Sequence, residues 1–307
     1  MGPCYSLKFV TSHIPDLRRF MSQARRLLIA TRHDFWRWIP VLIASQLGSL
    51  DIWLALRLGH TQTSIEDGVL CLSFPGRETV FWPISPGGIF HGAVEEAFML
   101  HWRDVRLLDQ YNARPSLGAG MVVVDVGANV GCFTMLASKV VEENGRVIAI
   151  EAIEKNFSCL QKTVDANRLT NVVPLQLAVG ERDGEIAISL SQFSGNHSAV
   201  LRRSDVSVTV PMRSLDSIVT QLGLRRIDFI KVDVEGMEPE VLRGATETIR
   251  RFRPVLAISA YHLPEHRESL PRILHEIEPT YNTEIKRLAG LEEVMLASPF
   301  KKGRPFA

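Results

Sequence analysis

A glycine-rich turn after a strongly apolar run is the first feature of this 307-residue chain that could bind a ligand. Residues 121–131 read MVVVDVGANVG, which predicts a buried strand that ends at Asp125 and opens through Gly127 into a helix near Gly131. Glycine lets a backbone approach a ligand closely, and N–H groups at a helix start can meet a carboxylate or phosphate. Asn129 stands where a dinucleotide fingerprint has its second glycine, so the turn alone does not identify the ligand.

Glu151 closes the next apolar run, VIAIE over residues 147–151. A carboxylate in this position can accept both hydrogens of a ribose diol, as in nucleotide-binding βαβ units. Alone it would be read as an exposed glutamate at a strand end, but together with the glycine turn it predicts a cofactor with an adenosine-like ribose. Ala178 and Val179, which follow the third run, are then expected beside the adenine.

Three acidic residues follow the fourth apolar run in KVDVEGME, residues 231–238. An extended backbone would place Asp233 and Glu235 on one face, at the sheet edge where ligands of open α/β proteins bind. Two neighbouring carboxylates can raise one another's proton affinity, which predicts a general base. A divalent metal ion is the alternative, but no further ligand stands at a telling spacing, so we predict no metal. Glu238 could simply supply negative charge at a helix start.

His262 comes just after the fifth apolar run, in AISAYHLPE. Histidine titrates near neutral pH, so His262 is a second candidate base, although a structural histidine is the plainer interpretation. Strands four and five should end at the same edge of the sheet, which would bring His262 and its neighbour Tyr261 to the acceptor site. His197, in the turn SGNHS, is a weaker candidate on a loop that could close over the cofactor.

The elements that must position these residues follow from apolar patterning. From residue 119 onward, short β-branched runs alternate with amphipathic helical patterns, as in a parallel sheet covered by helices. Apolar and polar residues alternate over 184–191 and 206–212, which predicts a pair of antiparallel strands inserted into the chain between the parallel ones. The predicted core strands are 121–126, 147–150, 172–178, 227–232 and 254–261. The predicted helical stripes are Cys132, Leu136 and Val140; Phe157, Leu160 and Val164; Val241, Leu242, Ala245 and Ile249; and Leu270, Ile273, Leu274 and Ile277.

The first 118 residues are less regular and predict an N-terminal extension of helices and one hairpin, near residues 69–83. Residues 113–120, ARPSLGAG, are the best candidate hinge, so we expect an extension over 1–118 and a catalytic domain over 119–307. Residues 38–56 are about as long as a bilayer crossing needs, but they contain polar residues and a proline. We expect them to pack on the catalytic domain rather than to make a peripheral membrane contact.

Composition narrows the classes of partner. Lysine plus arginine (35) nearly balances aspartate plus glutamate (34), so the charge does not favour a nucleic-acid partner and favours a small molecule. The four cysteines are scattered without a C-x-x-C pair, which argues against a zinc knuckle or a disulfide scaffold. A reducing, cytoplasmic location is the simplest expectation.

Five segments, taken in order and spacing over about residues 119–262, resemble the FkbM family of methyltransferases: DVGANVG, the acid after the second strand, LAVGERDGE, RSLDSIV and IDFIKVDVEGMEPEVLRGA. The resemblance implies an α/β fold with the seven-stranded, Rossmann-like class I methyltransferase core, a mostly parallel sheet with helices on both faces. It also implies S-adenosyl-L-methionine as methyl donor and usually an oxygen acceptor. By position, the cofactor residues would be Asp125, Gly127, Asn129, Gly131 and Glu151, while Asp233, Glu235 and Glu238 would face the active site. Ala152 and Thr163 stand at positions where the family usually has proline and asparagine, respectively.

Three functions are therefore weighed. The ordered motifs favour an O-methyltransferase acting on a small-molecule or glycan hydroxyl. An NAD(P)-dependent oxidoreductase could use the same ribose acid, but Asn129 replaces the middle glycine and no Tyr-x-x-x-Lys pair is recognisable. A non-catalytic cofactor-binding or membrane-associated scaffold is supported only by residues 38–56.

Overall fold

The computed structural model describes residues 62–73, 78–84, 108, 111–191, 197–201, 204–287 and 293–299. The chain divides into two compact units, 1–63 and 64–307, and the central sheet and the site belong to the second. The apolar segment 38–56 lies outside the described residues, so its predicted role stays a prediction. Within the described ranges, no helix is long and apolar enough to cross a membrane, and Cys71, Cys132 and Cys159 form no disulfide.

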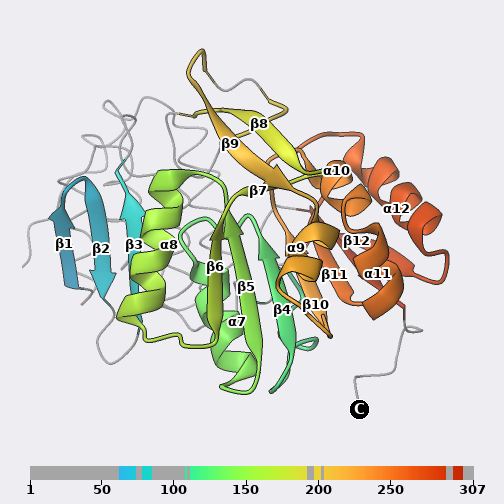
Figure 1. The fold of residues 1–307 in the computed structure, drawn as a ribbon, viewed down its shortest axis with the longest axis horizontal. Coiled ribbons are helices and arrows are strands. Elements are labelled where there is room, and N and C mark those ends of the chain that lie inside the picture. Colours follow the sequence, from blue (N-terminus) through green and yellow to red (C-terminus); the bar gives the residue numbers. More distant parts are fainter. Residues whose placement is uncertain are drawn as a thin grey trace, which may run out of the picture. The chain divides into compact units, whose positions relative to one another are not determined.

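A seven-stranded sheet forms the centre of the fold, in the order β12-β13-β11-β10-β4-β5-β6 (Figure 1). Its five strands from β11 to β6 are parallel, and β13 runs antiparallel to both its neighbours. The strands are β4 Val122–Val126, β5 Arg146–Glu151, β6 Val172–Gln176, β10 Phe229–Val232, β11 Val255–Ser259, β12 Asn282–Arg287 and β13 Glu293–Ser298. This arrangement confirms the predicted mostly parallel, seven-stranded α/β core.

The strand order reverses between β4 and β10. The chain passes from β4 to β5 and β6 on one side and returns to place β10 and β11 on the other. Ligands of open α/β sheets bind outside the carboxyl ends of the strands at such a reversal. The glycine turn after β4 and the acids after β10 therefore start from neighbouring strands.

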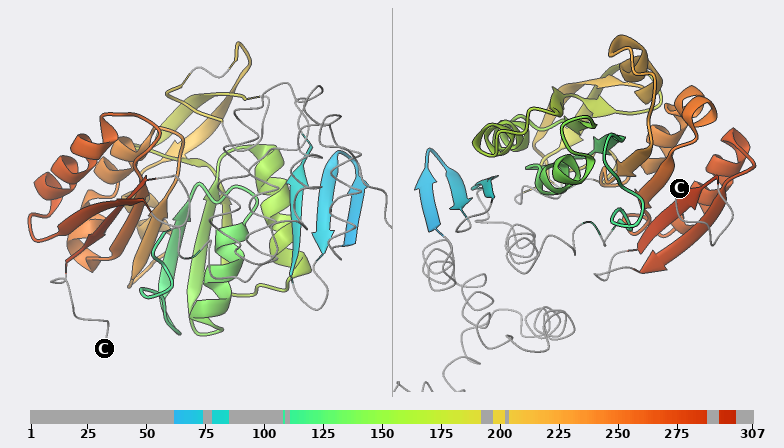
Figure 2. Two further views of the ribbon diagram at one scale, coloured as in Figure 1. Left: turned by 180° about the vertical axis from the view of Figure 1, so that it is seen from behind. Right: turned by 90° about the horizontal axis from the view of Figure 1, so that it is seen from below.

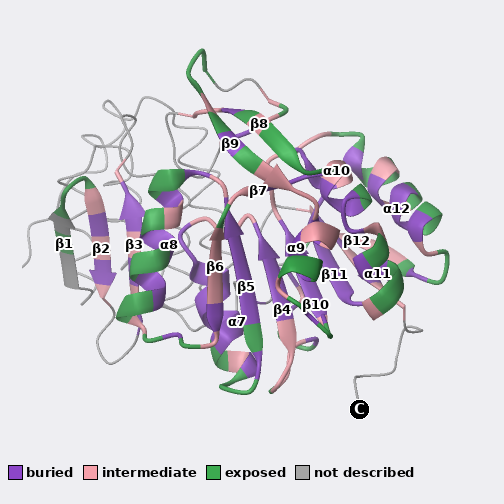
Figure 3. Cartoon of the chain, in the orientation of Figure 1, coloured by how far each residue is buried: buried purple, intermediate pink, exposed green. Residues whose placement is uncertain are grey.

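Helices cover both faces of the sheet. The apolar residues of α9 Leu215–Gln221, α10 Glu238–Arg243, α11 Thr246–Phe252 and α12 His266–Ile277 join one core with alternate strand residues such as Val124 and Ile148. Helix α7, Cys132–Val141, meets the other face, where Phe133 stacks on Phe229 of β10 at 6.4 Å between ring centroids. It lies behind the sheet in Figure 1 and in front of it in the reverse view of Figure 2. The central strands are buried along most of their length (Figure 3).

A second sheet, in the order β7-β9-β8, contains the predicted antiparallel pair. Strand β8, Gly184–Ser189, pairs antiparallel with β9, Ser207–Arg213, as predicted. The predicted strand over 172–178 is two strands, because β6 ends at Gln176 and β7, Ala178–Val179, pairs in parallel with β9 instead. This switch of sheets carries the chain from β6 to the rim of the site.

The single helical stripe predicted from Val241 to Ile249 is also two helices. Helix α10 ends at its C-cap, Gly244. A Cβ added at Gly244 would lie 2.0 Å from the carbonyl oxygen of Gly180, so the segment around Gly180 leaves no room for a side chain there. The Asp216 carboxylate then accepts the backbone N–H of Thr248 at 2.7 Å and so caps the start of α11. The predicted helix therefore breaks at a close contact and starts again at a cap.

The predicted hairpin is present as β2, Val69–Ser73, and β3, Thr79–Pro83, which pair antiparallel in a small sheet with β1, Gln62–Glu66. Strand β3 packs against α8, Glu154–Ala166. The Thr79 N–H donates to Asn167 Oδ1 at 3.0 Å, and the Phe81 N–H donates to Thr163 Oγ1 at 3.3 Å. Thr163, one of the two departures from the family pattern, thus helps to dock the hairpin.

Candidate active site

A pocket of about 750 Å³, including its open mouth, lies beyond the carboxyl ends of β4, β5 and β10. Eight of the residues singled out from the sequence line it: Gly127, Asn129, Glu151, Ala178, Val179, His197, Asp233 and Glu235. The fold therefore gathers the glycine turn, the strand-end acid and the acids after the fourth strand around one cavity.

Other predicted residues, namely Asp125, Gly131, Glu238, Tyr261 and His262, are not in the pocket lining. Asp125 is fully buried below the turn, and its carboxylate accepts the Thr134 hydroxyl at 2.5 Å. Gly131 begins α7 with φ 91°, and a Cβ there would lie 2.6 Å from the Leu160 side chain. His262 lies beside the acids, as described below. Asp125 and Gly131 shape the turn from below and from the side.

Lys231 is a site residue that the sequence reading missed. Its Nζ donates to Asp125 Oδ1 at 2.9 Å and to the Gly127 carbonyl oxygen at 2.8 Å, and it lies 5.2 Å from the centre of the Tyr111 ring. Lys231 and Asp125 are paired neighbours on β10 and β4, so the sheet register brings the two charges together. The sequence did contain a signal for this residue: a lysine stands within an otherwise apolar strand, and a buried charge needs a partner.

Glu151 connects the turn after β4 to the turn after β5 by hydrogen bonds. Its Oε2 accepts the N–H of Asn129 and its Oε1 accepts the N–H of Ile153, both at 2.9 Å. Burial raises the pKa of the Glu151 carboxyl, against the lowering effect of these hydrogen bonds. Each carboxylate oxygen has a second lone pair with which to accept a ligand hydroxyl.

Asn129 has φ 51°, and its buried Oδ1 has no hydrogen-bond partner within the described part of the chain. A left-handed asparagine with an unsatisfied amide oxygen, set in a pocket wall, is suited to accept a donor from a bound ligand.

The backbone after β10 is not extended as predicted. Glu235 has φ 53° and Gly236 has φ 113°, so the chain turns sharply two residues after Asp233. The Ser198 hydroxyl donates to the carbonyl oxygen of Glu235 at 2.5 Å and fixes this turn from the loop after β8. Both acids nevertheless line the pocket, so the predicted convergence arises from a turn rather than from strand alternation.

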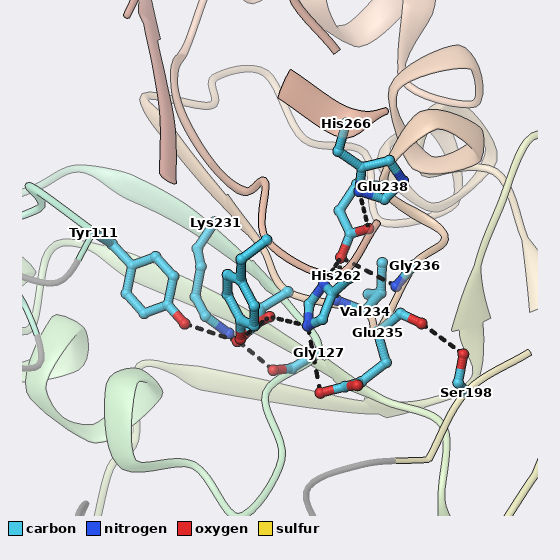
Figure 4. Close-up of polar contacts among 12 residues, drawn as sticks. Tyr111, Gly127, Ser198, Lys231, Val234, Glu235, Gly236, Glu238, His262 and His266 are labelled. Carbon is cyan, nitrogen blue, oxygen red and sulfur yellow. Dashed lines mark hydrogen bonds and ion pairs between the residues drawn. The ribbon is translucent and has the colours of Figure 1, made fainter. Parts of the chain in front are cut away.

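His262 lies between Glu235 and Glu238 (Figure 4). Its Nε2 is 3.4 Å from Glu235 Oε1 and 3.6 Å from Asp233 Oδ1, and its Nδ1 is 2.8 Å from Glu238 Oε1. Burial alone would lower the pKa of His262, but the surrounding carboxylates outweigh burial and raise it to about 11. In this arrangement His262 carries a proton at neutral pH, so it is not the free imidazole that a general base requires.

Asp233 is also unlike the expected base. Burial would raise the pKa of its carboxyl, but the charges of Lys231 and His262 and the Tyr111 hydroxyl, which donates to Oδ2 at 2.8 Å, hold it below the usual value. The expected mutual raising of proton affinity between acids is therefore wrong for Asp233. Tyr261 lies beside it, and its hydroxyl reaches Asp233 Oδ1 at 3.4 Å.

Glu238 faces the protein rather than the pocket. Its side chain is fully buried, and its Oε1 accepts the N–H groups of Val234 and Gly236 at 3.1 and 3.4 Å. His266 lies on its other side, with Nδ1 3.3 Å from Oε2. Glu238 therefore holds the turn after β10 and the His262 ring in place.

His197 lines the pocket on the side of the second sheet. Its Nδ1 accepts the N–H of Ser191 at 2.9 Å. Burial, with a smaller effect of Lys155, lowers the pKa of His197 to about 4, so the ring is neutral near pH 7. A neutral imidazole in the wall suits contact with an uncharged ring of a ligand.

Comparison with known proteins identifies a family and several similar proteins. The family model described as the methyltransferase FkbM domain matches residues 125–286, slightly more than half of the chain. "Methyltransferase 1" of Beauveria bassiana is 27% identical over 143 residues, which cover 40% of this chain and 57% of that protein. "Hexuronic acid methyltransferase AglP" of Haloferax volcanii is 27% identical over 175 residues, covering 57% of this chain and 69% of that protein.

A crystal structure of a methyltransferase FkbM from Methylobacillus flagellatus is similar with a TM-score of 0.49 and 22% identity. The similarity covers 67% of this chain and 53% of that one. This chain therefore spans only about half of the Methylobacillus protein and of the Beauveria protein.

Proposed function

Since the chain belongs to the methyltransferase FkbM domain family, we propose that it transfers a methyl group from S-adenosylmethionine to a hydroxyl oxygen of a small-molecule or glycan acceptor. The observation that carries the proposal is the single pocket that joins Glu151 and the glycine turn to Asp233 and Glu235. Family membership favours this reading over an NAD(P)-dependent oxidoreductase.

The residues of the pocket fit the proposed cofactor. Glu151 would accept the ribose hydroxyls, since each of its oxygens is held by one N–H and keeps a lone pair. Ala178 and Val179 supply an apolar wall for the adenine, and Asn129 Oδ1 offers an acceptor without a partner of its own in the described structure. When bound, the cofactor supplies a methyl group already activated on a sulfonium.

The chain's own residues then have to align the acceptor. Orientation can supply about 7–11 kcal/mol of the barrier, whereas a positioned base adds a factor of about 10²–10⁴, or about 3–5 kcal/mol. Asp233 is ionised and held by Tyr111 and His262, so it is placed to accept a hydrogen bond from the acceptor hydroxyl. We assign Asp233 to positioning the hydroxyl, Glu235 to taking up its proton, and His262 to fixing their carboxylates.

Ligand-induced stabilisation tests the cofactor. The full chain should melt at a higher temperature with S-adenosylmethionine or S-adenosylhomocysteine and not with NAD, because a ligand at 100 times its Kd stabilises by about 2.7 kcal/mol. A shift with NAD alone would contradict the proposal.

Paired variants test the roles of the two ends of the pocket. Glu151→Ala should weaken S-adenosylhomocysteine binding, measured by calorimetry, while Asp233→Asn should retain binding within a few-fold and lose turnover. Glu154→Ala is a matched control, because Glu154 is exposed in the first turn of α8. Equal loss of cofactor affinity in the Glu151 and Asp233 variants would contradict this division.

Acceptors can be sought with an isotopically labelled methyl donor, the purified chain and fractionated small molecules and glycans. A labelled product whose methyl carbon has the ¹³C chemical shift of a methoxy group, and whose methyl group is not released by mild base, is an ether, which identifies a hydroxyl acceptor. A base-labile methyl ester would instead identify a carboxylate acceptor and refute the assignment to a hydroxyl.

A further inference from the structure

The imidazole of His197 carries a hydrogen-bond donor that no group in the described part of the chain uses. Its Nδ1 accepts the backbone N–H of Ser191 at 2.9 Å, so this nitrogen carries no proton. A neutral imidazole that accepts at Nδ1 has its hydrogen on Nε2. None of the hydrogen bonds within the described ranges involves Nε2, and the ring lines the pocket. His197 therefore has one N–H to donate to a bound ligand.

The pocket wall next to His197 is apolar. His197 and Ala199 flank Ser198, which forms an antiparallel bridge with Ser189 next to the wall. Ala199 packs against a small cluster of buried apolar side chains beside the second sheet. The members of this group that also line the pocket are Ile153, Ala178, Ile188 and Ala199. The N–H of His197 is thus a polar group at the edge of an apolar surface.

This apolar wall begins beside the acid at the end of β5. Ile153 is two residues after Glu151, and its N–H donates to Glu151 Oε1 at 2.9 Å. Besides burial, the charge of Lys155 lowers the pKa of His197, so the imidazole lies near the start of α8. In a nucleoside the base is bonded directly to the ribose. A ribose held by Glu151 would therefore place its base near the apolar wall and His197.

Adenine has the properties that such a wall selects. Its two faces pack on apolar side chains, and its ring nitrogens accept hydrogen bonds, whereas its amino group donates them. An N–H group can therefore pair with a ring nitrogen but not with the amino group. We propose that His197 Nε2–H donates to a ring nitrogen of the adenine, which makes His197 a specificity-determining residue for the methyl donor. This inference rests on the proposed function, which supplies the cofactor.

Deaza analogues of S-adenosylhomocysteine test the contact. The 1-deaza, 3-deaza and 7-deaza compounds each replace one ring nitrogen by C–H, and calorimetry on the full chain gives a Kd for each. At least one analogue should bind about 2- to 12-fold more weakly than S-adenosylhomocysteine, because a neutral hydrogen bond contributes about 0.5–1.5 kcal/mol. Equal Kd values for all four compounds in the wild type would overturn the inference.

Two variants separate the donor from the ring. His197→Phe keeps an aromatic ring without an N–H, so the Kd ratio for at least one analogue should fall by about the same 2- to 12-fold. His197→Gln has an amide N–H and should keep part of that ratio. His275→Phe is the matched control, because His275 bonds to the Tyr281 carbonyl and is not in the pocket lining, and its ratios should match the wild type. A change in loop structure alone would weaken all four compounds equally and leave the ratios unchanged, which would overturn the inference.

Nuclear magnetic resonance of ¹⁵N-histidine-labelled wild type gives a second readout. The His197 Nε2–H signal should shift when S-adenosylhomocysteine binds, and an unmoved signal in the bound protein overturns the inference even where His197→Phe does not fold. Analogue discrimination that disappears in His197→Phe, without any labelled product of methyl transfer, refutes the proposed function alone. Binding of S-adenosylhomocysteine with no discrimination refutes the role of His197 alone. No binding of S-adenosylhomocysteine by the wild type refutes both.

Discussion

Replacing Lys231 by methionine should destabilise the protein more than any change at a surface lysine. Methionine keeps most of the length of the side chain but removes the ammonium that bonds to Asp125 Oδ1 and the Gly127 carbonyl oxygen. The side chains of Lys231 and Asp125 are 5% and 0% exposed, so the Asp125 carboxylate would stay buried without its counter-charge. Removing one partner of a buried ion pair costs about 3–5 kcal/mol.

Chemical denaturation followed by circular dichroism measures this loss. For a folded unit of about this size each kcal/mol lowers Tm by about 2–4 °C, so Lys231→Met should melt about 6–20 °C below the wild type. Lys286→Met is the matched control: Lys286 pairs with Glu284, and the two side chains are 42% and 39% exposed, so its loss should cost less than about 1 kcal/mol.

The double variant Lys231→Met/Asp125→Asn isolates the pair. If the penalty comes from the stranded carboxylate, the double variant should lose clearly less stability than the sum of the two single variants. A Lys231→Met protein as stable as the Lys286→Met control, or additive losses in the double variant, would refute the assignment of a buried ion pair.

Three further changes test other parts of the structure. Gly127→Ala should abolish cofactor binding and lower stability by at least about 1–3 kcal/mol, measured by calorimetry and denaturation, because φ is +78° and the new Cβ would lie 1.9 Å from the Asp233 carbonyl oxygen. His197 should stay neutral, with its proton on Nε2, down to a pH of about 4 in ¹⁵N nuclear magnetic resonance, because Nδ1 accepts the Ser191 N–H. Its lowered pKa means that stability falls as pH drops from about 6.5 towards 4, and His197→Gln should flatten that part of the profile. Ser214→Ala should cost about 1 kcal/mol by removing the side-chain cap of α9; no change on denaturation would refute that role.

The sequence predicted correctly which residues at the ends of strands lie at the pocket. Apolar runs fix where the strands end, and parallel strands end at one edge, so Glu151 and Asp233 were placed near the same cavity without a structure. Packing details were not accessible in this way. The pairing of Lys231 with Asp125 depends on strand register, and the left-handed turn at Glu235 depends on a hydroxyl from Ser198, far away in the chain.

The chemistry of single side chains was also beyond sequence reasoning. His262 was a candidate base because isolated histidine titrates near neutrality, but its pKa depends on three carboxylates that the fold brings to it. Likewise, the helix expected from Val241 to Ile249 is interrupted at Gly244, where the backbone packs against a distant segment that no local pattern encodes.

The contact between the Gly127 turn and the Asp233 carbonyl has a consequence for redesign. With no room for even a methyl group between them, the two backbone segments form one closely packed block. Loop grafts that aim to change acceptor preference by moving residues 233–236 should therefore also alter KM for the methyl donor. Directed evolution of new acceptors would be more productive at pocket walls outside this block, such as Ile188 and Ala199.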